Sequence, residues 1–142
     1  MTIVSMKGYK VKELKFVNKH ENGAKVQFTN KVSYNVRYTK NNICFGELNV
    51  EMFDKQAPEK FGVNLVLDGF FEFDTQAKKE TIHVSSFKEL YPLAKSIVAS
   101  VSVNAGIPPL ILPPFDIESQ AIYKFDNNNF GKKYEEDEEN GN

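Results

Sequence analysis

The fold is decided first by residues 25–38, Lys25-Val-Gln-Phe-Thr-Asn-Lys-Val-Ser-Tyr-Asn-Val-Arg-Tyr38, in which apolar and polar side chains alternate. Successive side chains of a β-strand point to opposite sides of a sheet, so a period of two places the apolar residues on one face. We therefore expect a strand with one buried face and one face in water.

Three more runs with strand character lie on either side of this stretch. Downstream, residues 44–52 and 61–73 each keep their apolar residues on one parity, and Gly69 interrupts the second run as at a bulge or a bend. Upstream, residues 9–17 form a weaker strand in which the apolar parity changes between Val11 and Leu14. The four runs predict a four-stranded antiparallel sheet, arranged as a meander.

A long helix is expected after the fourth run. Ser86 followed by Glu89 is the pattern of a capping box, and apolar residues then recur at helical spacing. Because proline lacks a backbone N–H and crowds the preceding turn, we expect the regular helix to begin near Pro92. Gly106 is placed to end it.

The helix is followed by residues 107–115, Ile-Pro-Pro-Leu-Ile-Leu-Pro-Pro-Phe. This segment holds too many prolines for a helix or a central strand, and too many apolar side chains for an ordinary solvated loop. Asp116 is suited to cap a second short helix, with Ile117, Ala121, Ile122 and Phe125 as its apolar residues. The sequence thus predicts one α+β domain, residues 1–125, followed by a disordered acidic tail, residues 126–142.

Composition and charge exclude several classes of protein. The 142 residues are 41% hydrophobic and 26% charged, and 18 basic against 19 acidic residues give a net charge of −1, which provides no field for nucleic acid or an anionic bilayer. The sequence begins without the basic flank and apolar stretch of a secretory signal, and no apolar run approaches the ~20 residues that span a membrane. The single Cys44 cannot form an internal disulfide, so we expect it in the core of a cytosolic protein.

Residues suited to catalysis or to metal binding do not form a recognisable set. Two histidines, His20 and His83, and one cysteine supply too few ligands at metal-site spacing, and both histidines are expected at the surface. Glycine-rich phosphate loops and a serine in a nucleophile-elbow context are missing. We therefore expect no enzyme, no metal and no cofactor.

The aromatic residues divide into two groups. Phe28, Tyr34 and Phe71 lie on the main apolar parity of their strands and are expected in the core. A second group lies on the other parity or in the proline-rich segment: Phe45, Phe53, Phe70 and Phe115. A sheet with apolar residues on both faces needs a second cover, which another subunit or a client polypeptide would supply.

Several segments together resemble the SecB family of export chaperones. They are Lys12-Glu-Leu-Lys-Phe16, Leu67-Asp-Gly-Phe-Phe71, Leu90-Tyr-Pro-Leu-Ala94 and, as the specific part, Ala105-Gly-Ile-Pro-Pro-Leu-Ile-Leu-Pro-Pro-Phe115. In that family a four-stranded antiparallel sheet is followed by a long helix that opens with an aromatic–Pro pair and ends at Gly-x-Pro. An apolar Leu/Pro segment then leads to a second helix. The order and spacing agree from about Lys10 to Phe125.

The resemblance implies a cytoplasmic homotetramer, formed as a dimer of dimers, that holds unfolded proteins in apolar grooves without ATP. Such a holdase needs broad apolar surface and no nucleotide site. The client-contact residues that we predict by position are Phe45, Phe53, Phe70, Leu110, Leu112, Phe115 and Tyr123.

The sequence departs from the family where the secretion motor SecA docks. Glu13 matches one acidic docking position, but Val17, Gly62 and Asn64 stand where further docking residues are expected. Two chaperone roles stay open, one in protein export and one for a dedicated client such as the antitoxin of a toxin–antitoxin pair. The alternatives from other classes are a small-molecule binding protein with the proline-rich segment as a flap, and an assembly subunit bound to one fixed partner.

Overall fold

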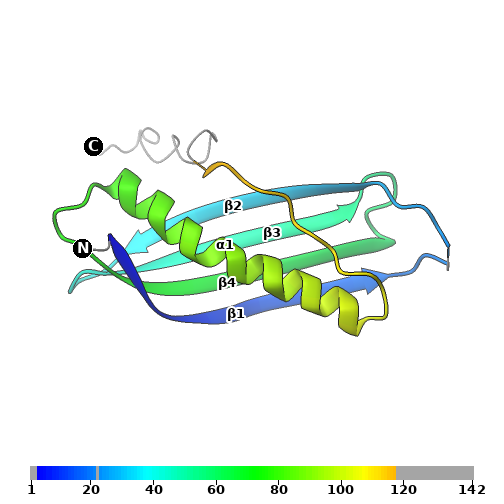
Figure 1. The fold of residues 1–142 in the computed structure, drawn as a ribbon, viewed down its shortest axis with the longest axis horizontal. Coiled ribbons are helices and arrows are strands. Elements are labelled where there is room, and N and C mark those ends of the chain that lie inside the picture. The colour runs from blue at the N-terminus through cyan, green and yellow to red at the C-terminus, as the bar shows by residue number, and fades with distance from the viewer. Residues whose placement is uncertain (1–2, 22, 118–142) are drawn as a thin grey trace.

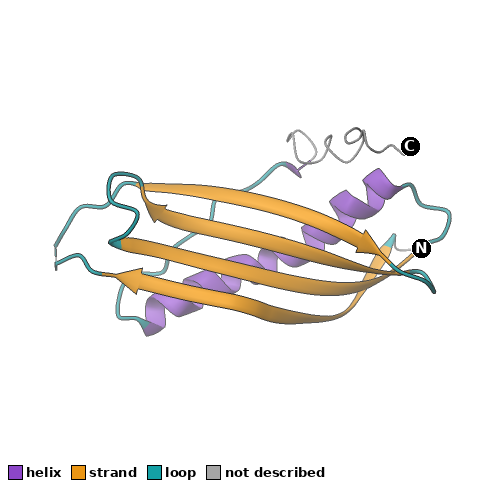
Figure 2. Cartoon of the chain, turned by 180° about the vertical axis from the view of Figure 1, so that it is seen from behind, coloured by secondary structure: helices purple, strands orange, loops and turns teal. Residues whose placement is uncertain are grey.

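The computed structural model describes residues 3–21 and 23–117. Four strands, β1 (Val4–Asn18), β2 (Phe28–Tyr38), β3 (Ile43–Asp54) and β4 (Phe61–Phe73), form one antiparallel sheet, and α1 (Lys79–Asn104) follows. The helix crosses one face of the sheet, called here the inner face, and residues 107–117 run back beside it (Figure 1). No element of the described chain covers the outer face (Figure 2). The expected α+β class, with its four-stranded antiparallel sheet and long helix, is confirmed.

The strands are ordered β1-β4-β3-β2, so the expected meander is wrong for β1. β2, β3 and β4 are consecutive neighbours, whereas β1 pairs with β4 at the far edge. This is a Greek-key order, in which a long connection brings the remaining strand beside a three-stranded unit. The connection between β1 and β2 must therefore cross one end of the sheet.

The parity change in β1 has a structural cause. The pairing of β1 with β4 shifts register between Val11 and Glu13, so that Val11 pairs with Leu67 and Leu14 with Leu65. A bulge adds one residue to a strand, and residues three apart then face the same side. Both apolar residues of β1 consequently lie on the inner face.

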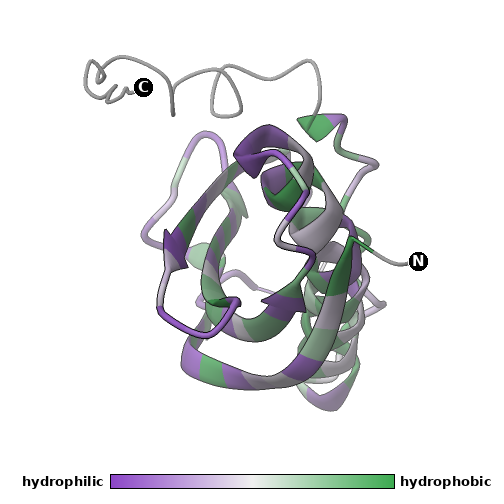
Figure 3. Ribbon diagram, turned by 90° about the vertical axis from the view of Figure 1, so that its left-hand side faces the viewer, coloured by the Kyte–Doolittle hydropathy of each residue, from purple (hydrophilic) through white to green (hydrophobic). Residues whose placement is uncertain are grey.

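Alternate residues of the central strands form the core. The buried positions are the even residues of β3 and the odd residues of β4, and the alternation of hydrophobic and hydrophilic residues is visible along the strands in Figure 3. Cys44, Tyr34 and Phe71 are buried, as expected. The hydroxyl of Tyr34 donates a hydrogen bond to Ser86 Oγ of α1 at 2.6 Å, and the Tyr34 ring occupies the space that a side chain at Gly46 would need. The missing side chain at Gly46 therefore lets β2 and α1 meet across β3.

The helix begins at Lys79, about three and a half turns before the expected start near Pro92. Ser86 is buried inside α1 and does not cap it, so the capping-box prediction is wrong. Ile82 and Phe87 are buried in the earlier turns. Burying two such side chains is worth about 1.5–3 kcal/mol each, which offsets the roughly 3 kcal/mol that a proline costs inside a helix.

The helix ends where expected. Gly106 has a positive φ of 89°, and the N–H of Ile107 donates to the carbonyl oxygen of Ser102 at 3.1 Å. Of the expected second helix, only Asp116 and Ile117 are described, and residues 118–125 lie outside the described residues, as does the expected tail, residues 126–142.

Candidate binding groove

A cavity of about 470 Å³ opens at the end of the sheet where β1 connects to β2. Residues of this connection form one wall, residues 107–110 form the other, and Phe28 and Phe61 lie between them. We call this cavity the end groove. It exists because α1 stops at Asn104 and the chain then turns back over β2 and β3.

Aromatic rings form the floor of the end groove. The Phe61 ring centroid lies 5.2 Å from that of Phe28 and 5.7 Å from that of Phe16. Phe61 is buried, but Phe28 keeps 39% of its surface exposed, so the expectation that Phe28 is a core residue is wrong. Phe28 begins an edge strand beyond the end of α1, where an inward-facing side chain lacks a full cover.

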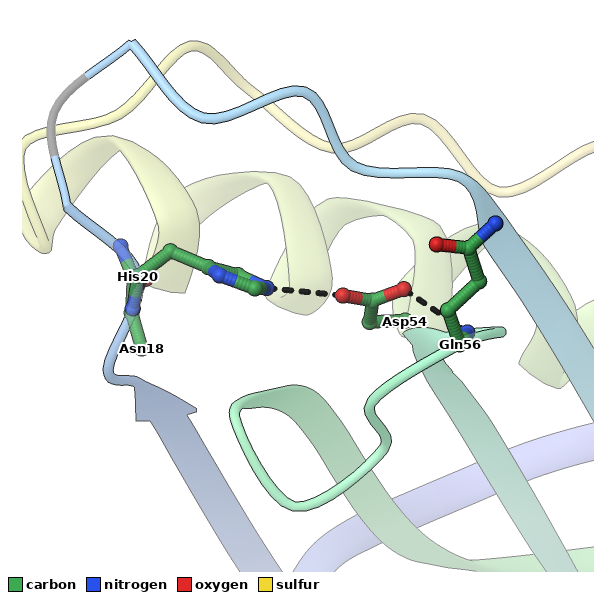
Figure 4. A network of polar contacts seen from close by, with 4 residues as sticks. All are labelled: Asn18, His20, Asp54 and Gln56. Atoms are coloured by element: carbon green, nitrogen blue, oxygen red, sulfur yellow. Dashed lines mark hydrogen bonds and ion pairs between the residues drawn. The ribbon is translucent and has the colours of Figure 1, made fainter.

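A hydrogen-bonded pair, His20 and Asp54, lies at one side of the end groove (Figure 4). His20 Nε2 lies 2.7 Å from Asp54 Oδ2, and the backbone N–H of Gln56 donates to Asp54 Oδ1 at 3.0 Å. Because an ionised carboxylate only accepts hydrogen bonds, Nε2 carries the proton. His20 also stacks on Phe61, with centroids 6.5 Å apart, so its expected surface position is wrong. The pair fastens the β1–β2 connection to the end of β3.

The hydrogen bonds to Asp54 make it sensitive to acid. The backbone N–H of Gln56, and then the ring of His20, hold the pKa of Asp54 below its ordinary value. A carboxyl group whose pKa is depressed in the folded state stabilises the protein above its unfolded pKa of about 4, and this stabilisation is lost as the pH falls through the folded-state pKa. The wall beside the end groove is therefore weakest in acid.

Two hydrogen bonds hold the proline-rich segment to α1. Ser102 Oγ accepts from the N–H of Leu110 at 2.8 Å, and the hydroxyl of Tyr91 donates to the carbonyl oxygen of Pro113 at 2.6 Å. Leu110 and Leu112 are only 8% and 1% exposed, whereas Ile111 between them is 68% exposed. The single chain thus covers two of the predicted client-contact residues with its own core, and they could reach a client only if the segment lifts. Their role stays a prediction.

Phe115 lies at the end of this segment and is half-buried. Its ring centroid is 5.5 Å from that of Phe87 and 6.2 Å from that of Tyr91. Tyr123, also predicted to contact clients, lies outside the described residues.

The remaining predicted client-contact residues lie on the outer face. Phe45 and Phe70 form an edge-to-face pair with centroids 5.0 Å apart, and the Arg37 guanidinium lies 4.9 Å from the Phe45 centroid. Phe53 lines a separate open hollow of about 550 Å³, and the Lys31 ammonium lies 5.7 Å from its ring. The predicted residues are therefore divided between the two faces of the sheet and do not form one site.

Glu13, the predicted docking residue, also lies on the outer face. It pairs with Val66 in the register of β1 and β4, and its carboxylate makes an exposed ion pair with Lys15 at 2.9 Å. Val17, Gly62 and Asn64 line the same outer hollow as Phe53.

An exposed apolar stripe on β1 was not foreseen from the sequence. Tyr9, Val11 and Leu14 pair with inner-face residues of β4, yet each is more than two fifths exposed. Sequence reasoning treated β1 as a weak strand of a meander, and only its position at the edge leaves these side chains uncovered. The parity change between Val11 and Leu14 was the available signal.

Polar groups in the core are structural. His83, which was expected at the surface, is buried against the Tyr34 ring, and burial lowers the pKa of His83 to about 4. Ser86 donates to the carbonyl oxygen of His83 at 3.1 Å, and burial raises the pKa of the Tyr34 hydroxyl. Because these side chains are sealed beneath α1, no substrate reaches them. Across residues 3–21 and 23–117, no group of three or more His, Cys, Asp or Glu side chains could hold a metal ion.

No helix in the described part of the chain is both long and apolar enough to cross a membrane.

Comparison with known proteins extends the structural description. No protein-family profile matches the chain. An uncharacterised protein of Methanocaldococcus jannaschii is 27% identical over an alignment of 118 residues, and the match covers 77% of this chain and 76% of that protein. This relative assigns no function.

Among solved structures, the chain is similar to a SecB-like chaperone of Mycobacterium tuberculosis, determined in complex with a peptide from the HigA1 antitoxin. The TM-score is 0.63 at 10% sequence identity, and the match covers 80% of this chain and 91% of the chaperone. A protein of unknown function from Streptococcus agalactiae matches with a TM-score of 0.46 and 14% identity, over 78% of this chain and 97% of that one. The chain therefore has the SecB-like fold, as the sequence resemblance predicted.

Proposed function

We propose that this protein is an ATP-independent, cytosolic chaperone that holds unfolded or partly folded polypeptides. The observation that carries the proposal is the end groove, whose floor is the Phe28–Phe61 ring pair and whose wall includes two prolines. The fold supports it, since the similar mycobacterial protein is a chaperone whose solved structure contains a bound peptide.

The dimensions and chemistry of the end groove suit an extended segment with bulky apolar side chains. Its volume of about 470 Å³ falls within the range of pockets that bury most of a ligand, and it leaves room for a few large side chains. Each buried apolar side chain contributes about 1.5–3 kcal/mol, largely independent of sequence. A polypeptide that is held through its buried apolar surface in this way requires neither catalysis nor a cofactor.

The client-contact surface that we assign has two parts. The first is the end groove with Phe28, Phe61 and the exposed Ile111. The second is the outer-face set Phe45, Phe53 and Phe70, which a long client would reach by passing around the edge of the sheet. Leu110, Leu112, Phe115 and Tyr123 complete the predicted surface if the proline-rich segment moves.

Suppression of aggregation tests the proposal. Light scattering from a thermally unfolding model enzyme should fall in the presence of this protein, and the Phe28→Ser variant should lose most of that effect. Val103→Ser is the matched control, because Val103 is an exposed apolar residue of α1 that does not line the end groove. If both variants suppress aggregation equally, the end groove is not the binding surface. If the unaltered protein does not suppress aggregation at several-fold molar excess, the proposed holding role is refuted.

Between the two chaperone roles, a dedicated client is favoured over general export. The peptide in the similar structure comes from an antitoxin, and the outer face around Glu13 carries Lys12 and Lys15 instead of an acidic patch. A basic docking partner such as the secretion motor would find little net negative charge there. Co-purification with a single antitoxin-like protein would support the role for a dedicated client, and binding to SecA would contradict it.

The SecB-like fold also supports a homotetramer. Exposed Tyr9, Val11 and Leu14 on the edge strand β1 provide apolar surface for contacts between subunits. Native mass spectrometry measures the assembly. A monomer carrying a small ligand would instead favour the hypothesis of a small-molecule binding protein.

A further inference from the structure

Charge is divided unevenly along this nearly neutral chain. Residues 3–117 hold 15 basic and 12 acidic side chains, a balance of +3, whereas residues 118–142, called here the C-terminal segment, hold three basic and seven acidic ones, a balance of −4. Five of those acids are consecutive, Glu135 to Glu139. In the other direction, residues 23–46 include four basic residues and no acid: Lys25, Lys31, Arg37 and Lys40. This basic stretch contains the whole of β2.

The basic side chains of the two edge strands, β1 and β2, have different partners. On β1, lysine ammonium groups pair with Glu72, Glu47 and Glu13 at 3.4, 2.6 and 2.9 Å. On β2, Lys31 and Arg37 lie over the Phe53 and Phe45 rings. Within the described ranges, neither they nor Lys25 and Lys40 make an ion pair. Three of the four lysines of β1 therefore have an ion-pair partner, whereas Lys31 has only Glu51 opposite it in the register, beyond ion-pair distance.

The described chain ends on the side of β2. Phe115 packs on Phe87, which packs on Tyr34 of β2 with ring centroids 5.5 Å apart in both contacts. In Figures 1 and 2, seen from opposite sides, the last described residues lie beyond the free edge of β2. The 18 residues that follow Ile117, up to and including Glu135, can span at most about 60 Å, against about 36 Å for the 11 residues of β2. The acidic cluster can thus reach any point of that strand.

We propose that the C-terminal segment docks, through the acidic residues 135–139, on the basic edge strand β2 of the same chain. Each exposed charge pair is weak. However, the acidic residues belong to the same chain, and a linker of this length gives an effective concentration on the order of millimolar, so that even weak, multivalent attraction populates the docked state. The attraction is screened at high ionic strength. Lysines on an edge strand have another role, because they prevent that strand from pairing with a second copy of the chain. That role predicts no contact between β2 and the C-terminal segment, so an observed contact distinguishes the two explanations.

Docking on β2 has a consequence for client binding, which rests on the proposed function. The docked segment covers Lys31 and Arg37 together with the aromatic rings beneath them, Phe53 and Phe45. A client that uses this part of the outer face must displace the segment, which therefore acts as an internal competitor. Neutralising the acids should strengthen client binding several-fold at low salt and leave it unchanged at high salt.

Paramagnetic relaxation enhancement in the full-length chain tests the docking without any client. A spin label is attached at Asn140→Cys. The native Cys44 stays unlabelled, because it is buried and burial raises the pKa of its thiol to about 11. At about 50 mM salt, amide signals of β2 should lose at least half their intensity, those of the central part of β1 should not, and about 500 mM salt should restore them.

Matched variants locate the contact. Lys31→Gln with Arg37→Gln should abolish the broadening of β2, and so should replacing the five acids 135–139 by Gln and Asn. Lys12→Gln with Lys15→Gln changes the net charge equally on β1 and should leave the broadening in place. Equal broadening of both edges, or none, would overturn the proposal. Broadening of equal size when isotope-labelled chains are refolded with spin-labelled chains would assign the contact to a second copy and overturn it as well.

Discussion

Phe70 and Phe71 are neighbours in β4, yet they belong to surfaces of different kinds. Phe71 is fully buried beneath α1, whereas Phe70 lies on the outer face against Phe45 and stays half-exposed. The inner face is an ordinary close-packed core, in which a change of one side chain is felt at once. The outer face combines an aromatic pair with exposed ion pairs, so a change of one side chain should cost less there. We therefore expect stability to reside mainly on the inner face.

The largest test of this contrast compares the two phenylalanines. Phe71→Ala should lower the free energy of unfolding by about 4 kcal/mol, because it opens a cavity in the core. Phe70→Ala should cost only about 1 kcal/mol, mostly the lost contact with Phe45. Urea denaturation followed by circular dichroism measures both. Similar losses would show that a cover absent from the single chain buries the outer face in solution.

The next largest effect is the pH dependence of the inner face. Burial lowers the pKa of His83 from an ordinary 6.5 to about 4, so the unfolded chain binds this proton more readily than the folded chain. Stability should consequently fall by about 3 kcal/mol as the pH drops from 7 to 4. In His83→Met, which cannot be protonated, the same pH change should have a clearly smaller effect. Denaturation midpoints of the unaltered protein and of His83→Met, each measured at pH 7 and pH 4, test this prediction. An equal loss of stability in the two proteins would mean that folded His83 is protonated at pH 4 and that its pKa is not lowered by burial.

Two glycines provide a smaller, matched contrast. A Cβ at Gly46 on the inner face collides with the Tyr34 ring, whereas a Cβ at Gly62 on the outer face meets Phe53 Cβ at an ordinary 3.5 Å. Gly46→Ala should therefore destabilise by about 2 kcal/mol and weaken the hydrogen bond between Tyr34 and Ser86. Gly62→Ala should stay within about 0.5 kcal/mol of the unaltered protein. Thermal unfolding resolves the difference, and equal melting temperatures would contradict the assigned packing.

The smallest expected effect lies in the outer-face ion pairs. Lys7 and Glu72 are both more than half exposed and 3.4 Å apart. Lys7→Gln should change stability by no more than about 0.5 kcal/mol, and salt should erase even that change. A loss of stability well above this value would mean that the ion pairs of the outer face contribute substantially to the stability of the fold.

Strand parity was the part of the fold most accessible to prediction. Buried Cys44, Tyr34 and Phe71 were found because a period of two acts along a single strand. The helix start was misplaced because proline carries a local penalty, whereas the burial of Ile82 and Phe87 that outweighs it is a tertiary contribution. The same limit applies to His20 and His83, whose surroundings come from distant strands.

The candidate site was less predictable than the fold. Leu110, Leu112 and Ile111 are indistinguishable as apolar residues between prolines. Which of them point inward depends on two hydrogen bonds, from the N–H of Leu110 to Ser102 Oγ and from the Tyr91 hydroxyl to the carbonyl oxygen of Pro113. Phe28 has core parity and is nevertheless partly open, because its strand lies at the edge of the sheet beyond the helix.

The sequence by itself determined which side chains share a face, that a long helix follows the strands and that Gly106 ends it, since each of these depends on residues a few positions apart. Only the tertiary structure decided that β1 pairs with β4, that the proline-rich segment buries its own leucines, and that the end groove stays open. Those outcomes depend on which distant surfaces meet, and the pairing that buries the most apolar area while satisfying the backbone is a property of the whole chain.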